Sequence, residues 1–238
     1  MKGRLSLRDM NMVIFAIAMP LVVLIILGFI YGSKPAFEGA GYSFIDQSFG
    51  ALCSIAICAG GLMGLPILIS DYREKKILKR FKVTPVSPTM ILFVHLCIYT
   101  LYSVASIASL WIVAGIFWGF RMKGSFLVFL GGWFLVLISV LSIGMLVGGI
   151  AKNSKQASVI ASVLYFPMLI FSGATLPYEI MPKGVQVVAN VMPLTEGIKI
   201  LKAAALGQEL TNVTVPIIVM SVLAAVCIIC SIKCFKWE

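Results

Sequence analysis

Six long apolar stretches constrain the fold of this chain more than any other feature. They cover about residues 12–31, 49–69, 90–118, 126–150, 157–176 and 213–232. A bilayer core about 30 Å thick requires roughly 20 apolar residues per helix, and in lipid each backbone polar group must bond within its own segment. Only 12% of the residues are charged, which leaves little for an aqueous domain. We therefore predict an all-α membrane protein, a single transmembrane domain over residues 1–238 with six transmembrane helices.

Lys and Arg residues are distributed unevenly between the connectors. If the N-terminus is cytoplasmic, 13 of the 19 basic residues lie in inner segments and six lie in outer ones. This bias predicts that both termini are cytoplasmic. The net charge of +10 does not indicate nucleic acid, because the positive charges lie in connectors between apolar stretches. The expected surroundings are a lipid bilayer, most simply the bacterial cytoplasmic membrane, which the chain crosses several times.

The connector after the second apolar stretch is strongly basic. Six of the ten residues from Arg73 to Lys82 are Lys or Arg. At about 100° per residue, one arc of a helix over about 70–84 is apolar except for Glu74. We expect an amphipathic helix at the inner membrane face. Docking on another protein is the favoured role for this helix, and it is compatible with anchoring to lipid. Glu74 should find a partner on another span or on another protein.

A second unusual connector lies on the outer side before the last span. It is too apolar for a solvated loop, and its two helical segments, within about 183–207, are too short to cross a bilayer. We expect a short helical hairpin that dips into the outer leaflet or lies on it. Pro193 should begin the second helix of this hairpin, and Gly207 should end it.

Features of ion-coupled transporters and of enzymes are missing from the sequence. No apolar stretch contains Asp, Glu, Lys or Arg in its interior, and His95 is more simply a structural residue. The chain has no phosphate-binding loop, no catalytic constellation and no metal-ligand spacing. Cys227, Cys230 and Cys234 share a helical face, and we interpret them as a packed helix end. Energy for any transport must therefore come from outside the membrane, and no cofactor is expected on this chain.

Three motifs resemble those of ABC type-2 exporter permeases. They are "DYREKKILKRFKVTPVSPTMIL" after the second span, "YFPMLIFSGATLPYEIMP" at the end of the fifth, and "NVMPLTEGIKILK" in the outer segment. Many members of that family have an aromatic residue where this chain has Glu196. The resemblance covers nearly the whole chain, and the three motifs follow one another in the order found in that family.

This resemblance implies a permease that works with two ABC ATPase subunits and a second permease subunit. ATP and Mg would bind to the ATPase, and this chain would not be an enzyme. The first motif implies a coupling helix whose ATPase-coupling residues are Tyr72, Arg73, Glu74, Lys75, Lys76, Lys79, Arg80, Lys82, Thr84 and Pro85. The other two motifs imply an outer segment that contains Ser172, Gly173, Pro177, Pro193 and Glu196.

Polar stripes and paired glycines mark the faces of several spans. The polar stripes comprise Tyr99, Ser103 and Ser106 in the third span, and Ser158, Ser162 and Tyr165 in the fifth. Such stripes usually form hydrogen bonds between helices; the alternative is a path for an amphipathic substrate. The spacing of the glycine pairs allows close helix approach; these pairs are Gly60 with Gly64, Gly115 with Gly119, and Gly144 with Gly148.

These observations lead to one principal interpretation of function and several alternatives. The principal interpretation is export of an amphipathic drug, peptide or lipid-like compound out of the cell. Such export would give multidrug or antimicrobial peptide resistance. Export of a polysaccharide or lipid-linked glycan is the alternative within transport. A non-transporting membrane scaffold for a cytosolic partner is the alternative from another class. A membrane enzyme is a further alternative, and it is disfavoured because the sequence shows no buried polar cluster.

Overall fold

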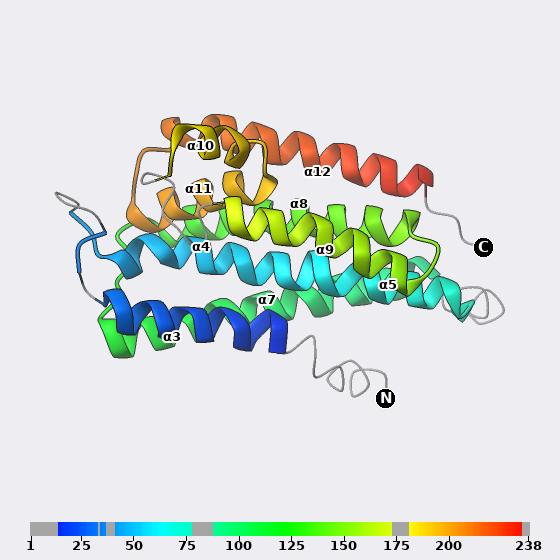
Figure 1. The fold of residues 1–238 in the computed structure, drawn as a ribbon, viewed down its shortest axis with the longest axis horizontal. Helices are drawn as coiled ribbons and strands as arrows, with labels where there is room; N and C mark the ends of the chain where they lie inside the picture. The colour runs from blue at the N-terminus through cyan, green and yellow to red at the C-terminus, as the bar shows by residue number, and fades with distance from the viewer. Residues whose placement is uncertain (1–13, 33, 37–40, 78–87, 173–180, 235–238) are drawn as a thin grey trace.

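The described helices lie side by side along the long axis of the molecule (Figure 1). The computed structural model describes residues 14–32, 34–36, 41–77, 88–172 and 181–234. Among them, the element order contains helices and no strand. Five helices are long and apolar enough to cross a membrane, and Ala16–Tyr31 is a shorter apolar sixth. This arrangement confirms the predicted all-α membrane class.

The helices follow the predicted spans closely, apart from their ends. The first contains a π-helical turn, Ile14–Ala18, and α3, Met19–Tyr31. The second combines α4, Phe44–Cys58, a π-helix η2, Ala59–Gly64, and α5, Leu65–Glu74. The remaining elements are α7, Pro88–Trp118; α8, Phe126–Ile150; α9, Ser154–Phe171; α10, Lys183–Ala189; α11, Pro193–Leu206; the 3-10 helix η4, Leu210–Val213; and α12, Thr214–Cys234.

The second span is the central helix of the bundle and is longer than predicted. It begins five residues before position 49 because Ser43 and Asp46 form a reciprocal cap. The Ser43 hydroxyl accepts from the Asp46 amide at 3.2 Å, and the Asp46 carboxylate accepts from the Ser43 amide at 3.0 Å. Nearly every residue of α4 is buried, as expected of a helix that is apolar on all sides. In Figure 1, the span runs between α3 and α7 on one side and α8, α9 and α11 on the other.

Glycines bring α8 against this central span. Gly144 faces the carbonyl oxygen of Gly61, and a Cβ at Gly148 would lie only 2.9 Å from the Ile69 Cβ. A Cβ at Gly64 would lie 2.7 Å from the Tyr99 ring. Two of the three predicted glycine pairs therefore lie at close helix contacts. Gly119 differs, since it ends α7 with a φ of +64° and no atom within 4 Å of an added Cβ.

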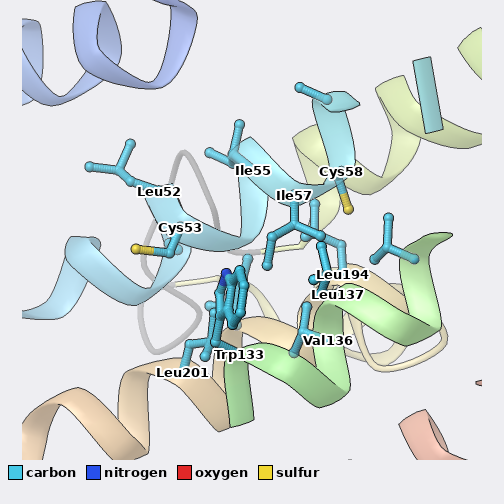
Figure 2. Packing of buried hydrophobic residues seen from close by; sticks show 14 of the residues in the cluster. Leu52, Cys53, Ile55, Ile57, Cys58, Trp133, Val136, Leu137, Leu194 and Leu201 are labelled. Atoms are coloured by element: carbon cyan, nitrogen blue, oxygen red, sulfur yellow. The ribbon is translucent and has the colours of Figure 1, made fainter. Parts of the chain in front are cut away.

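The outer hairpin inserts its second helix among the spans. Pro193 begins α11, and Gly207 ends it in the left-handed conformation, as predicted. Most of α11 is buried, and a Cβ at Gly50 of α4 would lie 2.6 Å from the Lys202 backbone nitrogen. Figure 2 shows Leu194 and Leu201 of α11 packed with Trp133 and the neighbouring residues of α8 beside α4. α11 is therefore part of the packed core, whereas most of α10 is exposed.

The contact at Gly144 provides a test of this packing. Gly144→Ala should destabilise the protein by roughly 1–3 kcal/mol, because the new methyl group meets backbone that cannot move aside. The matched control is Gly131→Ala on the same helix, where an added Cβ meets nothing within 4 Å. Thermal unfolding of the purified protein in detergent measures both. Equal melting temperatures for the two variants would contradict the close approach.

Candidate functional site

The end of the second span that the charge bias predicts to be cytoplasmic forms the candidate coupling site, and we call this end of the bundle its inner end. α5 ends at Glu74, Lys75 caps it, and Lys76 adopts a φ of +54°. This left-handed residue breaks the helix, so Tyr72, Arg73 and Glu74 belong to the transmembrane helix. The structure thereby divides the single helix predicted over 70–84. Lys79, Arg80, Lys82, Thr84 and Pro85 lie outside the described residues.

Arg73 binds the inner end of α8. Its Nη1 atom lies 3.2 Å from the carbonyl oxygen of Gly148 and 3.0 Å from that of Ala151, and it also donates to Gly149. The last carbonyl groups of a helix have no N–H donor within the helix to bond with. A cation at this end is also favoured by the helix dipole. Arg73 therefore caps the C-terminus of α8.

Glu74 binds the opposite kind of helix end. Its Oε2 atom accepts from the amide and the hydroxyl of Ser154, at 3.0 and 3.1 Å. Ser154 is the first residue of α9, where the helix dipole favours an anion. The partner of Glu74 is thus on another span. Glu74 is exposed, whereas the apolar arc predicts a buried position. That prediction assumes one continuous helix over about 70–84, but α5 ends at Glu74.

Consecutive side chains at the end of α5 reach three different helices. Tyr72 packs edge-on against His95 of α7, with ring centroids 5.2 Å apart. Arg73 reaches α8 and Glu74 reaches α9, as described above. Successive side chains of a helix point about 100° apart, so three consecutive residues can contact three different neighbouring helices. We call Arg73, Glu74 and residues 148–154 the inner clamp.

The polar stripes of the third and fifth spans have different surroundings. Ser103 accepts from Trp133 Nε1 at 3.2 Å, and Tyr99 packs on Gly64. Ser106 is completely buried, so the third-span stripe faces the interior of the chain. In α9, Tyr165 is buried, whereas Ser158 and Ser162 are half-buried. Only the fifth-span stripe reaches the surface of the chain.

A polar cluster in the outer hairpin surrounds Glu196. Lys199 Nζ lies 2.7 Å from Glu196 Oε1 and 2.9 Å from Asn190 Oδ1. The Glu196 side chain is 6% exposed and that of Lys199 31%, so the pair is largely withdrawn from water. The spacing of three residues could have predicted the ion pair. The contact with Asn190 could not be predicted, because it depends on how α10 meets α11.

The other predicted outer residues differ in what the structure shows of them. Ser172 is buried at the end of α9, where its amide donates to the Met168 carbonyl at 3.0 Å. Gly173 and Pro177 lie outside the described residues. Within the described ranges, no three His, Cys, Asp or Glu side chains lie close enough to hold a metal ion.

Comparison with known proteins identifies relatives over most of this architecture. A family model described as ABC-2 type transporter matches residues 4–206, a range that contains the inner clamp and α11. The inner membrane transport permease YhhJ of Escherichia coli K12 is 28% identical over 133 residues, which are 55% of this chain and 35% of that protein. Nodulation protein J of Rhizobium leguminosarum bv. viciae is 31% identical over 81 residues, 34% of this chain and 31% of that protein. The matched regions thus cover about a third of the length of these curated relatives.

The Glu196–Lys199 pair allows a stability test. Glu196→Ala should destabilise the outer hairpin by about 1–3 kcal/mol, less than a fully buried pair would cost, because Lys199 retains some contact with water. Glu209→Ala is the control, since Glu209 is exposed near the same end of the molecule. Thermal unfolding in detergent measures both changes, and a second change of Lys199→Gln should restore part of the loss. No difference between the Glu196 and Glu209 variants would contradict a structural pair.

Proposed function

Because the chain belongs to the ABC-2 type transporter family, we propose that it is the permease subunit of an ATP-driven exporter. The family and the apolar helices make it a multi-pass transport component of the cytoplasmic membrane. ABC-2 permeases work with ABC ATPases. The proposed ATPase binds ATP and Mg and hydrolyses ATP, and a second permease subunit, identical or different, completes the transporter.

One observation carries this proposal, and it lies at the inner end of the bundle. The chain leaves the second span directly after three residues that contact α7, α8 and α9. A force applied to the connector from the cytoplasmic side would therefore act on several spans at once. Charged residues in the described spans lie near helix ends, which also supports an energy source outside the membrane. The proposed docking surface is the basic connector that begins with Lys75 and Lys76.

The proposed substrate is an amphipathic drug, peptide or lipid-like compound. The half-buried Ser158 and Ser162 beside the apolar surface of α9 support this class, since they offer hydroxyl groups next to an apolar face. Multidrug or antimicrobial peptide resistance would be the physiological consequence. A polysaccharide or lipid-linked glycan is the second candidate substrate.

The proposed orientation can be tested by labelling. In a background without native cysteines, a Cys at Lys155 should be protected from an impermeant thiol reagent in intact cells, and a Cys at Lys183 should react. Both positions are exposed, so accessibility within the chain does not bias the comparison. The reverse pattern would contradict a cytoplasmic connector, and with it the proposed docking to an ATPase.

Copurification with an ATPase tests the function itself. The tagged chain should retain an ATPase subunit that contains a phosphate-binding loop, and the reconstituted complex should hydrolyse ATP faster with an amphipathic dye, a cationic peptide or a lipid-linked glycan. The probe that stimulates hydrolysis identifies the substrate class. A complex whose ATPase carries an alanine in place of the phosphate-loop lysine is the inactive control. A stable complex with no hydrolysis would favour the scaffold alternative.

A further inference from the structure

We propose that Arg73 and Glu74 are positioning residues that join the end of α5 to the α8–α9 turn, so that movement of the connector is transmitted to α9. This inference rests on the proposed function for its energy source. It assigns Glu74 a partner within the permease, whereas a docking role would assign it a partner on the ATPase.

The clamp holds both sides of a short turn. α8 ends at Ile150 and α9 begins at Ser154, so only three residues separate the two helices. Arg73 binds three carbonyl groups before or within this turn, and Glu74 binds the amide and hydroxyl just after it. The turn is therefore attached to α5 at both of its ends.

The order of the charges matches the direction of the two helices. The C-terminus of a helix attracts a cation, and the N-terminus attracts an anion. Arg73 reaches the C-terminus of α8, and the next residue, Glu74, reaches the N-terminus of α9. Exchanging the two charges would make both contacts unfavourable. The arrangement therefore depends on which charge stands at each position.

The burial of the spans indicates which helix such an attachment would move. Half of the apolar segment of α8 is buried within the chain, compared with 22% of that of α9. α8 is also fixed to the central span at Gly144 and Gly148. α9 has fewer contacts within the chain, so its inner end can follow α5 at a lower cost in packing.

The neighbouring ion pair between Lys75 and Asp71 does not join α5 to another helix. The Nζ atom of Lys75, the residue that caps α5, lies 2.8 Å from Asp71 of that helix; Lys75 is exposed and Asp71 is half-buried. That pair joins α5 only to itself. Asp71→Asn is therefore a matched control, because it removes a charge one turn from Glu74 without affecting a contact between helices.

The first experiment tests the hydrogen bond between Glu74 and the Ser154 amide in the purified permease without nucleotide. Hydrogen exchange of the peptide that contains the Ser154 amide should accelerate on the order of tenfold in Glu74→Ala, because its acceptor is lost. Glu74→Gln should exchange at an intermediate rate, since the amide oxygen can still accept. Asp71→Asn should match the wild-type rate. Unchanged exchange in Glu74→Ala would overturn the clamp, whatever the chain transports.

The second experiment measures transmission in the complex with its ATPase. ATP with vanadate should change the exchange rates of α9 peptides in the wild-type complex and in Asp71→Asn. In Glu74→Ala this nucleotide-dependent change should be lost, while the ATPase still copurifies and still hydrolyses ATP. Persistence of the change in Glu74→Ala would overturn the proposal, and so would loss of the ATPase from that variant, which would indicate docking. A wild-type complex without hydrolysis would instead contradict the proposed function, and the first experiment would still stand.

Discussion

The close approach of α8 to the central span is the contact on which the remaining structure depends. Gly144 lies against the backbone of Gly61, and Gly61 and Gly148 leave room for the Val140 and Ile69 side chains of the facing helix, so the missing Cβ atoms allow the short distance between the helices. Dispersion contacts made at such short range are the main source of helix association in lipid, where the hydrophobic effect does not act between helices. α8 and the second span therefore form a rigid pair. α11 packs against this pair near one end of the bundle, and the clamp attaches to it at the opposite end (Figure 1).

The sequence predicts the spans and the limits of the hairpin, because these follow from local chemistry. Apolar length predicts the helices, and Pro193 and Gly207 bound α11 through their backbone preferences. The end of α5 could not be predicted, because nothing in the residue type of Lys76 requires a left-handed conformation. The bond from Ser154 to Glu74 joins positions 80 residues apart, and no local pattern encodes it. Spacing likewise does not distinguish Gly119, which forms a turn, from Gly144, which packs.

Most of the charged groups whose bonds the structure shows satisfy backbone or side-chain partners at helix ends. Asp46 closes a capping box, Arg73 caps α8, and Glu74 accepts from the Ser154 amide at the start of α9. In a chain with only 12% charged residues, each such group has a strong local effect. An unsatisfied backbone group within the hydrocarbon core of a bilayer costs several kcal/mol. The few charges therefore lie where the helices would otherwise present bare ends.

The π-helix at Ala59–Gly64 has a consequence for how this chain can change over time. A π-helical turn accommodates one residue more than an α-helical turn, so it sets the rotational phase of α5 relative to α4. That phase decides that Tyr72 meets α7, Arg73 meets α8 and Glu74 meets α9. Loss of one residue from this segment would rotate all three side chains by about 100° and aim each at the wrong neighbour. Close contacts at Gly61 and Gly64 restrict the side chains that η2 can carry, and the rotational phase of α5 additionally fixes the number of residues in it.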